Sequence, residues 1–298
     1  MLRVTSSTDG VAVDAPAKVN LTLRVAGTRP DGYHDLESVV AAAGLFDRLR
    51  FEPADDLQFT CDDPAVPSGD DNLVLKAARL LREFCGVSRG ARINLRKRIP
   101  AGRGFGGGSS DAAACLAGLN ALWQCGRTVA ELAGLGVRLG SDVPLFFSSP
   151  VAVMRGRGER VEPVSARPKW HAALVWPAFG NPTADVYAAY DRRPPSADGR
   201  PGATDILKCM GGPAREAASF LVNDLEPAAR SLRPEGLSVR TLLERAGAAA
   251  VGMTGSGSAY FALTDTEIEA RRLVDAARAG GAEAVAAAVG GTFNSFKE

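Results

Sequence analysis

Apolar residues recur along this chain with two different spacings. In Ala15–Val25 and Ala91–Ile99 every second residue tends to be apolar, which is typical of strands that bury one face. In Asn72–Cys85, Ser109–Trp123 and Glu267–Arg278 the apolar residues lie three and four positions apart, which predicts helices with one buried side. The strands and helices therefore do not follow one another in a regular repeat.

Caps and turns add further elements to this pattern. Val151–Val164 and Val251–Leu263 each read as strand, turn and strand. A capping box predicts a helix start at Thr128, and Val239–Ala246 reads as a helix that Gly247 ends. Hairpins mixed irregularly with helices favour an α+β fold over a parallel sheet of strand–helix–strand units.

Two of these elements make detailed predictions about burial. Lys97 is the exception on the apolar face of the strand that Pro100 ends. The first helix is expected to turn a single face inward, made of Leu73, Ala77, Leu80, Leu81 and Phe84.

Length and composition restrict the class of protein. The 298 residues suggest two domains, which we divide into residues 1–155 and 156–298, with 192–202 as a surface loop. Apolar residues make up 46% of the chain, so it can form a core. The 35 basic and 34 acidic residues leave a charge of +1, which argues against a general nucleic-acid or membrane-surface binder.

Neither a membrane nor a metal cluster is expected. The apolar runs are shorter than the roughly 20 residues that cross a bilayer, and the first residues lack a secretory signal, so we expect a cytoplasmic protein. The five cysteines lack a C-x-x-C pair and there are two histidines, which favours reduced thiols over disulfides or a zinc site.

A glycine-rich loop carries the strongest chemical signal. It runs from Pro100 to Asp111, between an alternating strand and an amphipathic helix. Its glycines permit positive φ and let successive amides point at one anion, and the helix that follows adds its positive end. Hydroxyl groups at the helix start can reach phosphate oxygens or a magnesium ion. We therefore expect a polyphosphate site formed by Pro100, Gly102, Gly104, Gly106, Gly107, Gly108, Ser109 and Ser110.

Other glycine-rich loops fit less well. A Walker A loop requires a Lys after its last glycine, and none follows Gly107 or Gly108. Gly102, Gly104 and Gly107 match a dinucleotide fingerprint by letter, but 120–124 supplies no acid for a ribose. A flexible linker without a ligand remains an alternative, although both flanking elements are strongly patterned.

The loop resembles a motif of the GHMP kinases, the family of galactokinase and of homoserine, mevalonate and phosphomevalonate kinases. Pro100–Ala113 is similar to the family's second motif, Ala15–Leu21 to the first, and Met253–Ala259 to the glycine-rich third. The resemblance implies an ATP-dependent kinase with an N-terminal ribosomal-S5-like domain and a C-terminal ferredoxin-like domain. The site would lie in the cleft between them.

Further segments resemble one branch of that family. This branch phosphorylates the 2-hydroxyl of 4-diphosphocytidyl-2-C-methylerythritol in the non-mevalonate isoprenoid route. The similar segments are Gly32–His34, Leu139–Pro144, Gly156–Glu159 and Asn223–Glu226. Phe105 departs from the usual leucine, and Pro182–Tyr187 matches only loosely.

The resemblance also implies roles for individual residues. Asp142 would accept the proton of the substrate hydroxyl, and Lys18 would lie beside both groups. Tyr33 would stack near the cytosine, and His34 would bond to it. Further contacts to the substrate or the phosphates are implied for Asn20, Tyr187, Thr254, Gly255 and Ser256. A magnesium ion would bridge the phosphates, with no protein ligand assigned.

Without the resemblance these residues have simpler interpretations. Asp142 would be a turn acid before Val143, Lys18 a solvated strand lysine, and His34 a polar surface residue. Alternative functions are another small-molecule kinase of the family, a non-catalytic nucleotide-binding regulator, and an NAD-dependent oxidoreductase. The last is disfavoured because this chain lacks the expected acid after the loop. A homodimer is left open.

Overall fold

The computed structural model describes residues 1–193 and 201–291. The predicted surface loop at 192–202 falls largely outside these residues. The described strands and helices confirm the α+β class. The division at residue 155 stays a prediction, and it falls within the strand β7 (Val151–Gly156).

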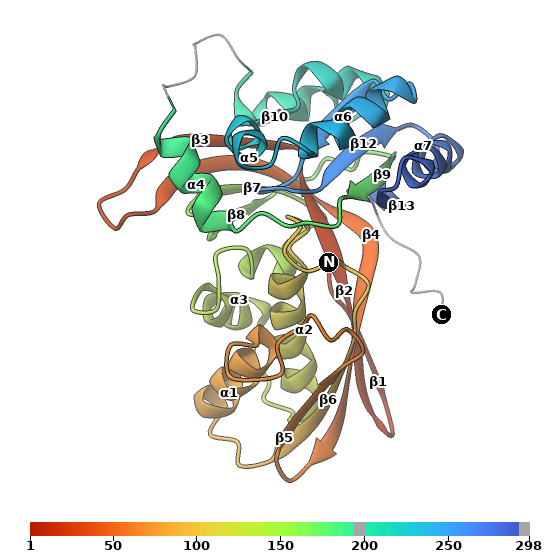
Figure 1. Cartoon of the computed structure of the whole chain (residues 1–298). Helices are drawn as coiled ribbons and strands as arrows, with labels where there is room; N and C mark the ends of the chain where they lie inside the picture. Colours follow the sequence, from red (N-terminus) through yellow and green to blue (C-terminus); the bar gives the residue numbers. More distant parts are fainter. Residues whose placement is uncertain (194–200, 292–298) are drawn as a thin grey trace.

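The first half of the chain forms a twisted sheet with helices on one side (Figure 1). Its strands are β1 (Arg3–Ser7), β2 (Gly10–Asn20), β4 (His34–Ala54), β5 (Leu57–Cys61) and β6 (Gly90–Arg96). The helices that cover it are α1 (Leu73–Cys85), α2 (Gly107–Leu122) and α3 (Val129–Val137), and a short 3-10 helix, η1 (Pro144–Phe147), follows.

The second half forms the upper part of Figure 1. Its strands are β9 (Trp170–Trp176), β10 (Val222–Asn223), β11 (Ala250–Met253), β12 (Tyr260–Thr264) and β13 (Glu283–Val289). Its helices are α4 (Thr183–Asp191), α5 (Glu226–Leu232), α6 (Gly236–Arg245) and α7 (Glu267–Ala279), with 3-10 helices η2 (Ala203–Cys209) and η3 (Ala214–Ser219). The predicted hairpin after residue 150 is present as β7 and β8 (Arg160–Pro163).

The strand β4 joins the two halves. Its first part pairs with β7 and β3 (Thr22–Thr28), and its last part pairs with β6. Between them it meets β13 at Ala43 and Val289, so the strand order β1-β2-β4-β13-β9-β12-β11 crosses the whole molecule. The end of β2 therefore lies where the two halves meet.

The predicted strand Ala15–Val25 is in fact two strands. The break is at Leu21, where the Asn20 amide donates a hydrogen bond to the Thr254 hydroxyl (3.0 Å) and the Leu21 amide donates to the Val39 carbonyl of β4 (2.9 Å). Both β2 and β3 pair with β4, so the regular ladder is interrupted only locally. The C-terminal half of β2 is buried on both faces, including Lys18.

The helix predictions hold with small corrections. Asn72 caps α1 through bonds to the amides of Val74 and Leu75, and α2 begins at Gly107, two residues earlier than expected. The prediction that Phe84 faces inward was wrong. Phe84 is 45% exposed, and the Arg127 guanidinium lies 5.1 Å from the centroid of its ring.

Lys97 is buried and belongs to an ionic cluster that the strand pattern did not predict. Its ammonium group lies 2.6 Å from a carboxylate oxygen of Asp47 and 2.6 Å from one of Asp111. Burial alone would lower the pKa of Lys97, but the two carboxylates raise it above its ordinary value. Burial and the Asp47 charge raise the pKa of Asp111 well above its usual range. The Asp47–Lys97–Asp111 cluster ties β4 to the N-terminal part of α2.

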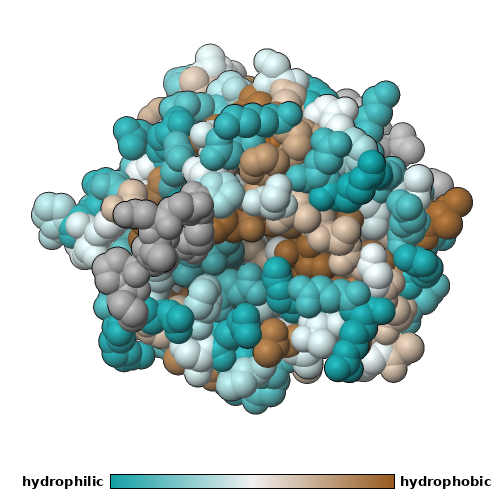
Figure 2. Space-filling model, turned by 90° about the horizontal axis from the view of Figure 1, so that it is seen from above, coloured by the Kyte–Doolittle hydropathy of each residue, from teal (hydrophilic) through white to brown (hydrophobic). Residues whose placement is uncertain are grey.

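The surface carries hydrophilic and hydrophobic side chains. Seen from above, the two kinds are interspersed, with several hydrophobic residues toward the middle of the face (Figure 2). Within residues 1–193 and 201–291, no helix combines the length and the apolar character that crossing a bilayer requires.

Replacing Lys97 by methionine should strongly destabilise the protein. The substitution leaves two carboxylates buried without their cation, which costs about 3–5 kcal/mol of unfolding free energy. Urea denaturation measures this loss. Lys76→Met is the matched control, because Lys76 is half-exposed and lies 3.7 Å from Asp71, so its loss should cost less than about 1 kcal/mol. Equal losses in the two variants would contradict the importance of the cluster.

Candidate active site

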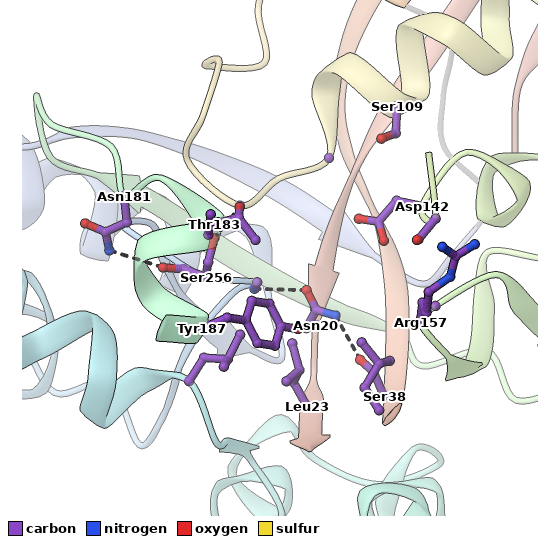
Figure 3. A pocket seen from close by; sticks show the side chains of 18 of the residues that line it. Asn20, Leu23, Ser38, Ser109, Asp142, Arg157, Asn181, Thr183, Tyr187 and Ser256 are labelled. Atoms are coloured by element: carbon purple, nitrogen blue, oxygen red, sulfur yellow. Dashed lines mark hydrogen bonds between the residues drawn. The ribbon is translucent and has the colours of Figure 1, made fainter. Parts of the chain in front are cut away.

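A cavity of about 940 Å³ lies where the two halves of the chain meet. Its walls come from the end of β2, the start of β4, the glycine-rich loop, the turn before η1, helix α4 and the loop after β11 (Figure 3). Most polar side chains that Figure 3 labels belong to these segments. A volume of this size fits two small ligands side by side or one extended ligand.

The glycine-rich loop forms one wall. Gly102, Gly104 and Gly106 have φ angles of 68°, 92° and 72°, in the left-handed region that glycine tolerates. Gly106 is the N-cap of α2 and supplies no side-chain cap, so the first amides of α2 have no carbonyl partner within the helix. This wall therefore presents unpaired donors and the positive end of a helix dipole to the cavity.

Two glycine-rich segments support each other at this wall. The Thr254 hydroxyl donates to the Gly104 carbonyl (3.1 Å), and the Ala259 amide donates to the Arg103 carbonyl (3.1 Å). A Cβ on Gly104 would lie 2.2 Å from the Thr254 carbonyl oxygen, so only glycine allows this approach. The loop after β11 (residues 254–259), called the C-terminal loop below, thus fixes the position of the glycine-rich loop (residues 100–111), called the phosphate loop below.

Lys18 and Asp142 meet in the cavity although 124 positions separate them. The Lys18 ammonium lies 3.6 Å from an Asp142 carboxylate oxygen. Lys18 is 4% exposed, whereas the Asp142 side chain is 35% exposed and faces the cavity. The interpretation of Lys18 as a solvated strand lysine is therefore wrong, because β2 is covered on both faces at this point.

Asn20 holds Lys18 in place. Its side-chain oxygen accepts hydrogen bonds from the Lys18 ammonium and from the Gly255 amide (2.9 Å). Its side-chain nitrogen donates to the Ser38 hydroxyl (2.8 Å). Figure 3 shows this amide between Ser38 and the C-terminal loop. The side-chain oxygen of Asn20 is thus bonded to other groups of the protein, and it fixes the position of the Lys18 ammonium group.

Aromatic side chains line the other end of the cavity. The buried His34 ring stacks on Tyr187 with centroids 4.8 Å apart, and its Nε2 lies 2.7 Å from an Asp191 carboxylate oxygen. Tyr33 is 55% exposed at the rim, with the Arg157 guanidinium 4.7 Å from its ring centroid. Burial, and then the charge of Asp142, raise the pKa of Tyr187 to about 12, so its phenol keeps its proton at neutral pH. This end offers flat apolar faces together with polar edges.

The structure brings together most of the residues that the sequence predicted. All of them line the cavity except two, Ser110 and Thr254. Both are fully buried. Thr254 lies behind the wall and braces the phosphate loop, and the Ser110 hydroxyl has no partner within the part of the chain that the structure describes.

Some cavity residues were not predicted. Arg157 lies inside the Gly156–Glu159 segment that carried the resemblance, but nothing in the sequence marked its side chain. Asp191 had no local signal, because its partner His34 is 157 positions away. The other unpredicted polar residues of the cavity are Ser38, Arg103, Ser141, Asn181 and Thr183.

The donor set of the cavity suits a hard cation that arrives with a phosphate ligand. Residues 1–193 and 201–291 contain no group of three or more His, Cys, Asp or Glu side chains that could hold a metal. The cavity does present oxygen donors, the Ser109 hydroxyl and the Asp142 carboxylate. Magnesium prefers oxygen ligands and often takes several of them from substrate phosphates.

Comparison with known proteins identifies the family. The model of the N-terminal domain of GHMP kinases matches residues 72–149, and the model of the C-terminal domain matches residues 206–283. A 4-diphosphocytidyl-2-C-methyl-D-erythritol kinase of Pelotomaculum thermopropionicum is 43% identical over 88% of this chain and 91% of its own. The enzyme of that name from Chlorobium luteolum is 38% identical, over 90% of this chain and 94% of its own.

Solved structures support the same family and fold. A crystal structure of 4-(cytidine 5'-diphospho)-2C-methyl-D-erythritol kinase matches with a TM-score of 0.81 and 39% identity, over 94% of this chain and all of that one. A homoserine kinase from Cytophaga hutchinsonii, at 19% identity and a TM-score of 0.74 over 98% of both chains, shares the fold. These findings confirm the two-domain fold that the motifs implied. The chain belongs to the GHMP kinase family, and within it to the group of 4-diphosphocytidyl-2-C-methyl-D-erythritol kinases.

Proposed function

We propose that this kinase transfers the terminal phosphoryl group of ATP to the 2-hydroxyl of 4-diphosphocytidyl-2-C-methyl-D-erythritol, a step toward isoprenoid precursors. One observation carries the proposal. The Lys18–Asp142 pair lies in one cavity between the phosphate loop and the aromatic end. A cavity that holds a triphosphate, an alcohol and a flat base needs phosphate-binding amides, then a base and a cation for the alcohol, and then aromatic faces for the ring.

Each group has a defined part in the reaction. Asp142 is the group that accepts the hydroxyl proton, since its carboxylate is exposed to the cavity. The Lys18 ammonium stabilises the negative charge that develops on the substrate oxygen, and Asn20 holds it in position. Phosphoryl transfer depends mainly on such positioning and charge neutralisation.

The glycine-rich wall binds the phosphates. Gly106, Gly107, Gly108 and Ser109 offer main-chain amides and a hydroxyl at the start of α2. Magnesium, when bound, neutralises phosphate charge, and the Ser109 hydroxyl is the protein oxygen that would hold it together with the phosphates. The buried Ser110 hydroxyl serves the shape of the loop rather than a ligand in the cavity.

The aromatic end recognises the cytosine. Tyr33 and Tyr187 provide ring faces, and stacking on such faces holds a base. His34, fixed by Asp191, directs a ring nitrogen of defined orientation toward the base edge. Homoserine and mevalonate have no base, so this end favours the cytidine substrate over the two other small-molecule substrates considered.

A substrate panel tests the proposal. ADP release is measured with ATP and each of three alcohols, the cytidine diphosphate-linked methylerythritol, homoserine and mevalonate. We expect release with the first alone. Turnover of homoserine or mevalonate at a higher kcat/KM would overturn the proposal, and tight ATP binding without release on any alcohol would favour a non-catalytic regulator.

Asp142→Asn should reduce turnover by roughly 10²- to 10⁴-fold, because the amide cannot accept the hydroxyl proton. The similar shape should leave the KM for ATP and the melting temperature close to those of the wild type. Steady-state kinetics and thermal melting measure both. A near-normal kcat would remove Asp142 from the role of base.

Tyr33→Ala should raise the KM for the cytidine substrate about tenfold, because one stacking face is lost. The KM for ATP should not change, since the proposal assigns Tyr33 to the base and not to the phosphates. Phe84→Ala is the control, an exposed aromatic residue on α1 that does not line the cavity. An equal change in both KM values would place Tyr33 outside the base site.

A further inference from the structure

Arg157 is a cavity residue for which the mechanism above has no use. It lies in the tight turn of the β7–β8 hairpin, between Gly156 (φ 70°) and Gly158 (φ 110°). The Arg157 amide donates to a Glu159 carboxylate oxygen (2.7 Å), and the Gly158 amide donates to the Arg155 carbonyl (3.1 Å). The turn is thus held by its own bonds, and the half-buried Arg157 side chain is directed to the cavity.

The position of Arg157 links the two ends of the substrate site. The turn packs beside Asp142, since a Cβ on Gly158 would lie 3.6 Å from an Asp142 carboxylate oxygen. The Arg157 guanidinium lies 4.7 Å from the Tyr33 ring centroid. Figure 3 shows Arg157 near Asp142, across the cavity from Tyr187. Any substrate that connects an alcohol at Asp142 to a base at Tyr33 must pass this guanidinium.

The charge of Arg157 is also available. Of the described residues that line the cavity, Lys18, Arg103 and Arg157 carry a fixed positive charge. Lys18 is engaged by Asn20 and Asp142, and Arg103 donates to the Ala178 carbonyl (2.6 Å). The guanidinium of Arg157 contacts the Tyr33 ring.

Asp31 is an acid whose pKa the charge of Arg157 lowers, but another cation already neutralises it. Asp31 accepts hydrogen bonds from Arg29 at 3.2 and 3.3 Å. That bond is the main reason why the pKa of Asp31 is low, and Arg157 adds only the smallest of the contributions. Asp31 therefore does not use up the charge of the guanidinium.

We propose that Arg157 binds the diphosphate that joins the cytidine to the methylerythritol, and so makes the cavity specific for a diphosphate-linked alcohol. This inference rests on the proposed function and adds a specificity residue to it. A guanidinium forms paired, charge-assisted hydrogen bonds with phosphate oxygens, which an amide or an aliphatic side chain cannot replace. The contact with Tyr33 orients the same group toward the linker.

Binding of CDP and of cytidine separates this role from a purely structural one. Isothermal titration is performed on the wild type, Arg157→Gln and Arg157→Lys with each probe. We expect Arg157→Gln to weaken CDP binding about tenfold and to leave cytidine binding within about twofold, with Arg157→Lys in between. The KM for the diphosphate-linked substrate should rise to match, while kcat and the KM for ATP stay the same.

The control variant is Arg160→Gln, three residues further along the same hairpin. Arg160 is exposed and does not line the cavity, so its loss should change neither affinity. Equal melting temperatures of the three variants would show that each is folded.

Two results would overturn the assignment. If Arg157→Gln weakened cytidine as much as CDP, Arg157 would act only by supporting Tyr33. If it weakened neither while the wild type still turned over the substrate, Arg157 would have no part in recognition and the proposed function would stand. A wild type that bound neither probe would instead overturn the proposed function, and this assignment with it.

Discussion

A buried ammonium group must be surrounded by oxygen atoms, and this requirement organises the site around Lys18. The oxygens come from Asn20, on the same strand, and from Asp142, in a turn 124 positions away. Asn20 in turn accepts a hydrogen bond from the Gly255 amide and donates one to the Thr254 hydroxyl, both in the second half of the chain. One cation thus brings together three distant segments. The same contacts that stabilise the junction also place a carboxylate beside the position of the reacting alcohol.

The phosphate loop depends on similar close contacts. Gly104 and Gly106 allow the loop to approach Thr254 and Lys18 more closely than any residue with a Cβ could. On its other side, the Asp47–Lys97–Asp111 cluster fixes the N-terminal part of α2 to the sheet. The donors of the loop are therefore positioned before a nucleotide binds, which is the condition for electrostatic stabilisation of a transition state.

Local patterns predicted the phosphate loop and the helices α1, α2, α3, α6 and α7, because periodicity, caps and glycines act over a few residues, but they did not predict α4 or α5. They did not predict β4 or β13. Residues 38–43 of β4 are buried on both faces and show no alternation, and β13 is rich in alanine and is held by packing between β9 and β4. The pairing of Lys18 with Asp142 is a long-range contact that the family resemblance alone implied. Arg157 was missed because a turn arginine carries no pattern.

The central claim is that the Lys18–Asp142 pair addresses one substrate alcohol in front of the phosphate loop. A crystal structure with a non-hydrolysable ATP analogue and the cytidine diphosphate-linked methylerythritol tests it most directly. The account predicts that the 2-hydroxyl lies within hydrogen-bonding reach of Asp142 and Lys18 and faces the terminal phosphorus. A complex in which the alcohol contacts neither side chain, or in which the triphosphate lies away from the glycine-rich wall, would contradict it.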